Sequence, residues 1–217
     1  MSRIGAWIVR LTWLFCAATP AMAGTLNVQA NLADREPFIG AVVTVRGETV
    51  HASAAPISAI LDQINLSFVP DIVVIPVGST VEFPNSDSVS HQIYSFSPTK
   101  RFQLPLYHGR PYPPVHFDQA GVVTLGCNIH DAMVGYIFVT DATYFGRTDA
   151  RGTWSVTNVP RGIYHVSLWH PLLRDSVASL DREVTITGDE TAQTTVQLAQ
   201  SLRPAPLPAS ARLRDRY

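Results

Sequence analysis

The chain is divided into short apolar runs, rich in β-branched residues, that end within a few positions at glycine, proline, asparagine or aspartate. Residues 78–83 are typical, because Thr80 and Glu82 alternate there with Val81 and Phe83. A period of two places alternate side chains on opposite faces of a strand. Helical spacing is scarce in comparison. The pattern therefore predicts an all-β protein.

The strand-like runs fall into two groups along the chain. Residues 24–140 hold most of them and are predicted to form a β-sandwich. Residues 141–200 contain a hairpin-turn pattern at 148–153 and further alternating runs, which predict a second, small immunoglobulin-like or transthyretin-like sheet. Residues 25–46 could pair with this second unit. Residues 201–217 are rich in proline and arginine, offer no core, and are predicted to be a disordered tail.

The N-terminus has the pattern of a secretory signal peptide over residues 1–23. Arg3 and Arg10 lie on the N-terminal side of an apolar run at 11–18, and the Ala-Met-Ala sequence at 21–23 is typical of a cleavage site. The apolar run is shorter than the roughly 20 residues that a bilayer crossing needs. We expect an exported, periplasmic protein with no stable membrane insertion. An uncleaved N-terminal anchor is the alternative.

The charge of the chain argues against nucleic acid as a partner. The formal net charge is −1, and it becomes −3 once the two arginines of the predicted signal peptide are removed. The remaining sequence has no basic cluster of the kind that binds a phosphate backbone.

The cysteines and methionines are few and informatively placed. The sequence has two cysteines and three methionines, and removal of the signal peptide would leave Cys127 and Met133 as the single thiol and the single thioether. One thiol in an exported protein cannot form an internal disulfide, so it pairs between chains, stays free or binds a ligand. Because His130 lies between the two sulfur-containing residues, ligand binding is the favoured interpretation.

The spacing Cys127-x2-His130-x2-Met133 places a thiolate, an imidazole and a thioether in one tight loop between two predicted strands. Two histidines and one cysteine in a trigonal arrangement, with a weak axial methionine, form a blue-copper site. A single loop could thus supply three ligands to one copper ion.

A second histidine must come from elsewhere in the chain. The predicted strand at 78–83 leads through a polar turn to His91, which would complete the ligand set. Asn85, in that turn, is placed to brace the copper loop through side-chain hydrogen bonds. Backbone amides from Asn128 onward could donate to the Cys127 sulfur and tune the reduction potential.

These motifs resemble those of the cupredoxins, specifically amicyanin and the related proteins labelled methylamine-utilisation proteins. The resemblance covers roughly residues 60–140 and implies a Greek-key β-sandwich with one type 1 copper. It also implies that Asn85 braces the copper loop and that His130 is the partly exposed ligand through which electrons pass. Amicyanin-like loops usually carry prolines beside the second histidine, whereas Ile129 and Asp131 flank it here. Residues 141–200 have no counterpart in a simple amicyanin and resemble carboxypeptidase-regulatory-like sheets.

The residues leave several functions open. The first hypothesis is a non-enzymatic one-electron carrier between redox proteins such as a dehydrogenase and a cytochrome c. The alternatives are a copper storage or delivery protein with the same ligands, and an envelope protein with a degenerate site. Cys127 could also be a buried structural thiol, and Met133 a core residue. The other histidines lack ligand partners at useful spacing: His51, His108, His116, His165 and His170.

Overall fold

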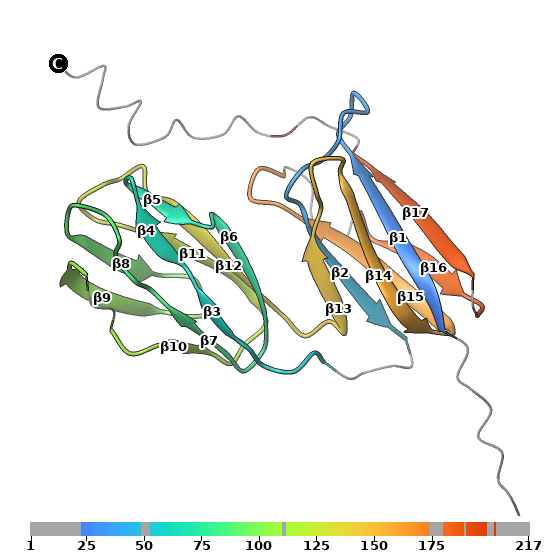
Figure 1. Cartoon of the computed structure of the whole chain (residues 1–217), viewed down its shortest axis with the longest axis horizontal. Coiled ribbons are helices and arrows are strands. Elements are labelled where there is room, and N and C mark those ends of the chain that lie inside the picture. The colour runs from blue at the N-terminus through green and yellow to red at the C-terminus, as the bar shows by residue number, and fades with distance from the viewer. Residues whose placement is uncertain are drawn as a thin grey trace, which may run out of the picture.

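The computed structural model describes residues 23–48, 53–109, 112–173, 180–188, 190–198 and 202. Every element that it names is a β-strand, which confirms the all-β prediction. Figure 1 shows the strands in two lobes, one from the middle of the chain and one that combines strands from both ends. Most of the predicted signal peptide and of the predicted tail lies outside the described residues. Within them, no helix is long and apolar enough to cross a membrane.

The lobe from the middle of the chain contains three sheets. Its strands are β3 (Ser58–Ile60), β4 (Asp62–Ile64), β5 (Ser67–Val69), β6 (Ile72–Pro76), β7 (Ser79–Glu82), β8 (His91–Ser95), β9 (Phe102–Tyr107), β10 (Val115–Phe117), β11 (Gly121–Gly126) and β12 (Val134–Thr140). The largest sheet has the order β6-β12-β11-β8-β9, the second has the order β10-β7-β3, and β4 pairs with β5. Strand β6 runs parallel to β12, whereas β11 runs antiparallel to both β12 and β8.

One apolar core lies between the larger sheets of this lobe. Alternate residues of β11 and its continuation, Val123, Leu125 and Cys127, are buried in it. Val81 from the facing sheet and Ile137 from β12 belong to the same cluster. The period of two seen in the sequence thus points one face of each strand into a shared interior, and this interior ends at Cys127.

The other lobe joins the two ends of the described chain. Its strands are β1 (Ala23–Asn31), β2 (Val42–Gly47), β13 (Tyr144–Arg147), β14 (Thr153–Pro160), β15 (Gly162–Trp169), β16 (Arg182–Ile186) and β17 (Thr191–Gln197). They form one sheet in the order β14-β1-β17 and another in the order β13-β2-β15-β16. Strand β1 alternates strictly, with Leu26, Val28 and Ala30 buried in a second core. The immunoglobulin-like or transthyretin-like type of this unit stays a prediction.

Two segments differ from their sequence-based interpretation. The five prolines of residues 97–114 predict a long loop from the sequence, but β9 occupies residues Phe102–Tyr107. Strand β9 is at the edge of its sheet, where Pro105 lacks an amide hydrogen that a central strand would need. The sequence of residues 57–65 suggests a short helical or irregular crossing, but these residues contain β3 and β4. Each of these strands has three residues, too few to show an alternation in the sequence.

Candidate metal centre

The predicted ligands lie at the ends of neighbouring strands. Cys127 directly follows β11, Met133 directly precedes β12, and His91 is the first residue of β8. The segment between Cys127 and Met133 closes the β11–β12 hairpin, in which Gly126 pairs with Val134. Gly126 also pairs with Tyr94 of the antiparallel β8. This register carries the start of β8, and with it His91, alongside the loop.

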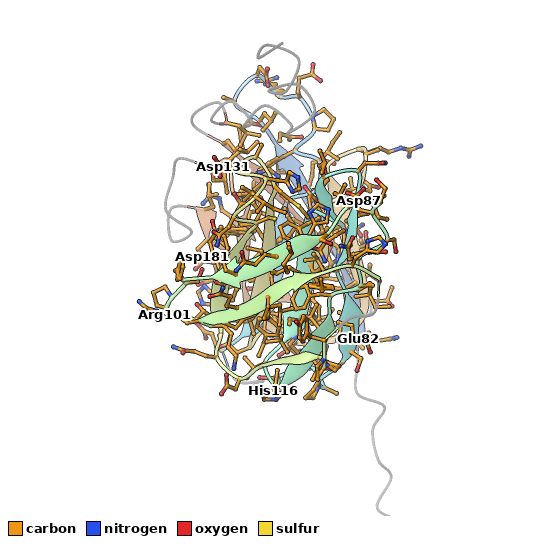
Figure 2. The ribbon with its side chains drawn as sticks, turned by 90° about the vertical axis from the view of Figure 1, so that its left-hand side faces the viewer. Glu82, Asp87, Arg101, His116, Asp131 and Asp181 are labelled. Atoms are coloured by element: carbon orange, nitrogen blue, oxygen red, sulfur yellow. The ribbon has the colours of Figure 1, made fainter. Side chains whose placement is uncertain are left out.

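Two tight backbone contacts shape the loop. The Met133 amide donates to the His130 carbonyl at 2.8 Å, and the His130 amide donates to the Cys127 carbonyl at 3.4 Å. The chain therefore turns twice within seven residues and brings His130 back over Cys127. Figure 2 shows that the end of the lobe carrying Asp87 and Asp131 is opposite the end carrying His116.

Three donor atoms face one another at this end of the lobe. The Nδ1 atoms of His91 and His130 are 3.1 Å apart, and the Cys127 sulfur lies 3.9 Å from each of them. A point in the plane of these atoms is therefore about 2.1 Å from all three, which matches ordinary metal–imidazole and metal–thiolate distances of roughly 2.0–2.3 Å. The side chains accordingly fit a single ion in trigonal coordination.

The trigonal site is largely shielded from water. The exposed fraction is 0% for His91 and 2% for Cys127, whereas His130 is partly exposed. Burial, and then the neighbouring His91, lower the pKa of His130 below its ordinary value of 6.5, although Asp87 opposes this shift. A neutral imidazole keeps a lone pair for a metal, so His130 is suited to ligation near neutral pH.

Met133 lies in the same buried cluster as Cys127 and is only 1% exposed. The structure thus brings all four predicted ligands to one end of the lobe. The thioether is three residues beyond His130 and is anchored by its backbone contact to that residue. A thioether at this end of the lobe would be available as the weak fourth donor that accompanies a His2Cys ligand set.

Asp87 is a site residue that the sequence analysis missed. Its Oδ2 lies 3.0 Å from Nε2 of His91. Burial alone would raise the pKa of Asp87, but hydrogen bonds from the Leu66 amide, the His91 ring and the Ser88 amide lower it from 3.8 to about 2. An ionised carboxylate only accepts hydrogen bonds. His91 must therefore donate from Nε2, and Nδ1 is the ring nitrogen that faces Cys127 and His130.

Asn85 braces a different segment from the one expected. Its amide nitrogen donates to the carbonyl oxygens of Val89 and Tyr107, both at 2.9 Å, and its Oδ1 accepts from the Asp87 amide at 3.0 Å. The sequence predicts such bracing for the loop that contains Cys127. Within the described residues, Asn85 instead ties the segment before His91 to strand β9.

Tyr107, at the end of β9, supports this arrangement. Its hydroxyl donates to the Phe83 carbonyl and accepts from Nε2 of Gln63, each at 2.5 Å. Burial raises the pKa of Tyr107 to about 12, against the opposing effect of the Gln63 hydrogen bond. The phenol therefore stays neutral and holds β9 against the strand that leads to Asn85.

Asn128 and His165 also differ from expectation. The Asn128 side chain donates to Gln92 Oε1 at 3.0 Å on the surface, and the predicted amide bond to the Cys127 sulfur is not found among the described residues. His165, expected to lack ligand partners, lies between Glu48 and Glu183. This second cluster is exposed, and such surface groupings are common without a metal.

Several apolar side chains on the loop and on the strands beside it are exposed. Ile129, beside His130 in the loop, is 54% exposed, and Val134 at the start of β12 is 37% exposed. Phe96 is 72% exposed and, together with Met133 and Val134, lines one shallow hollow. We call Phe96, Ile129 and Val134 the loop-side apolar patch.

Comparisons with known proteins reveal partial structural likenesses. No protein-family model matches the sequence, and no curated protein matches it either. A purple cupredoxin from Nitrosopumilus maritimus is 29% identical, with 38% of this chain and 99% of that chain covered, at a TM-score of 0.35. A reduced amicyanin variant is 18% identical, with 45% of this chain and 99% of that chain covered, at a TM-score of 0.35.

A third likeness is to a larger protein. The copper-containing nitrite reductase of Thermus scotoductus SA-01 is 29% identical over 44% of this chain, at a TM-score of 0.37. This chain spans about a quarter of that enzyme chain, since 25% of it is covered. With TM-scores this low, the case for a metal centre rests on the side chains described above.

Proposed function

We propose that this chain is a cupredoxin-type protein with one type 1 copper, held by His91, Cys127 and His130 with Met133 as the axial ligand, and that it carries single electrons. The observation that carries the proposal is the triangle of one sulfur and two Nδ1 atoms around a common point. Copper held by these residues would supply the redox chemistry through its Cu(I) and Cu(II) states.

The donor set favours copper over the commoner structural metals. Structural zinc takes four nitrogen or sulfur ligands in a tetrahedron and rarely a thioether. Magnesium and calcium take oxygen ligands. One thiolate, two imidazoles and a nearby thioether match the trigonal copper arrangement. Of the described residues, only Cys127 supplies a free thiol.

The surrounding residues favour electron transfer with little rearrangement. His91 is hydrogen-bonded through its outer nitrogen, and Asn85 holds the segment that leads to it. Cys127 and Met133 are both packed in the core. A ligand set fixed in this way keeps the same geometry in both oxidation states. His130 is the partly exposed member of the set and supports electron entry and exit through its ring.

We extend the proposal to location and partners. The signal-peptide pattern at residues 1–23 supports export to the periplasm. The loop-side apolar patch supports transient docking of a redox protein, such as a dehydrogenase or a cytochrome c, because its side chains are exposed and apolar. The role proposed for the chain is that of a carrier and not of a catalyst.

A copper titration tests the proposed function. Cu(II) added to the metal-free protein is expected to bind one ion per chain and to produce an intense visible absorption that one electron bleaches reversibly. A colourless protein that binds only Cu(I) would contradict the carrier role and favour copper storage or delivery. Failure to bind either ion would favour a degenerate site.

Replacement of Met133 by leucine tests the axial role. We expect the colour to remain and the reduction potential to rise, because loss of the thioether donor favours Cu(I). A tenfold change in the relative affinity for the two ions corresponds to about 59 mV. Ile137→Leu is the matched control, since it changes a buried side chain of the same core without altering a sulfur. A potential for Met133→Leu that is equal to or lower than that of the control would refute the axial assignment.

A further inference from the structure

We propose that Asp87 is a positioning residue whose carboxylate fixes the ring of His91 for metal binding and lowers the reduction potential of the site. The inference rests on the proposed function, because the potential is that of the copper held by His91.

The contact between Asp87 and His91 is shielded from solvent. The carboxylate Oδ2 and the ring Nε2 are 3.0 Å apart, and the side chains of Asp87 and His91 are 8% and 0% exposed. Metal-bound histidines almost always donate their other ring N–H to an oxygen acceptor, which fixes the tautomer and the ring orientation. Asp87 is the acceptor here, and it brings a full negative charge.

The carboxylate is held in place from several sides. Its Oδ2 also accepts from the Leu66 amide at 2.7 Å, and its Oδ1 accepts from the Ser88 amide at 2.7 Å. The backbone amide of Asp87 donates in turn to Asn85 Oδ1 at 3.0 Å. With donors on both oxygens and a fixed backbone, the carboxylate cannot turn away from His91 without breaking several hydrogen bonds.

The turn that presents the Leu66 amide is itself unusual. Asn65 and Leu66 connect β4 to β5 with φ angles of 51° and 57°, the left-handed conformation that a two-residue type I′ hairpin turn requires. Leucine rarely adopts this conformation because its Cβ approaches the backbone. Strained positions cluster at functional sites, and this one directs an amide at Asp87. The β4–β5 hairpin therefore serves as a clamp on the carboxylate.

The charge has a defined effect on the site. A negative carboxylate one imidazole away from the metal stabilises the doubly charged oxidised ion more than the singly charged reduced ion. Low exposure limits the screening of this interaction by water. The hydrogen bond also raises the basicity of His91 Nδ1, which strengthens its bond to a cation. Both effects lower the reduction potential relative to a site with a neutral acceptor.

Asp87→Asn tests the inference, because it keeps an oxygen acceptor and removes the charge. We expect the affinity for Cu(II) to fall roughly tenfold more than the affinity for Cu(I), which is within the range seen when a hydrogen-bond partner of a metal ligand is lost. The reduction potential should then rise by about 59 mV. Asp131→Asn is the matched control, since it removes an exposed carboxylate beside His130 and should leave the potential nearly unchanged. Equal potentials for the two variants would overturn the inference.

A second measurement does not depend on copper. Nitrogen-15 NMR of the metal-free wild-type protein should show a hydrogen on Nε2 of His91, coupled to the contact with Asp87. A His91 ring with no hydrogen on Nε2 would overturn the positioning role, whether or not Asp87→Asn folds. If the protein took up no copper while His91 carried its hydrogen on Nε2, the proposed function would fail but the Asp87–His91 contact would stand.

Discussion

Replacing Cys127 with serine is expected to abolish the visible absorption of the copper-loaded protein. The intense colour of such a site arises from charge transfer between a thiolate and Cu(II), and a hydroxyl group provides no equivalent donor. Within the described residues no other thiol can substitute, because Cys127 is the one free cysteine found there. The loss of a direct ligand should also weaken copper binding beyond the roughly 10–100-fold loss caused by removing an outer hydrogen-bond partner.

Absorption spectroscopy of copper titrations measures this effect directly. Serine is nearly isosteric with cysteine, so thermal unfolding of the metal-free variant should stay close to that of the wild type. His116→Gln is a suitable control, since His116 lies at the opposite end of the lobe, and it should bind copper with full colour (Figure 2). Retention of the band in Cys127→Ser would exclude Cys127 as the source of the colour.

Replacing Asn85 with alanine is expected to give the largest loss of stability among the residues around the site. Asn85 is 3% exposed and makes three hydrogen bonds, to the Val89 and Tyr107 carbonyls and from the Asp87 amide. The variant would leave these backbone groups without their partner, at about 1 kcal/mol each. We therefore expect the free energy of unfolding of the metal-free protein to fall by about 3 kcal/mol.

Chemical denaturation of the metal-free protein measures this loss without interference from copper. Asn128→Ala is the matched control, because Asn128 makes one exposed hydrogen bond to Gln92. Surface substitutions of that kind usually change stability by no more than about 0.5 kcal/mol. If both variants lost the same small amount, Asn85 would not brace the segment that leads to His91.

The loop ligands could be predicted from the sequence because their positions depend on local geometry. Cys127, His130 and Met133 lie within seven residues between two strands, so a hairpin connection alone brings them together. His91 is distant in sequence and was placed with them through resemblance to a family. Asp87 could not be assigned a role, because its importance depends on which nitrogen of His91 faces outward. An acidic residue four positions before a proposed ligand histidine was the available signal.

In the fold, too, features set by neighbouring residues could be predicted, whereas features set by the pairing of distant strands could not. Strand β1 could be recognised from its own alternation, but its parallel pairing with β17 joins residues at opposite ends of the chain. Strand β9 was missed because Pro105 argues against a strand unless the strand lies at an edge. Its edge position is a property of the assembled sheet and cannot be read from residues 102–107 alone. Tyr107, which anchors this strand beside Asn85, was missed with it.

Copper K-edge X-ray absorption of the copper-loaded protein tests the central claim most directly, because it counts the atoms bound to the metal. The claim is that one sulfur and two imidazole nitrogens, from Cys127, His91 and His130, hold one ion in a trigonal arrangement. We expect a coordination shell with one short metal–sulfur contact and two nitrogen contacts. A shell made only of nitrogen and oxygen atoms would contradict the account.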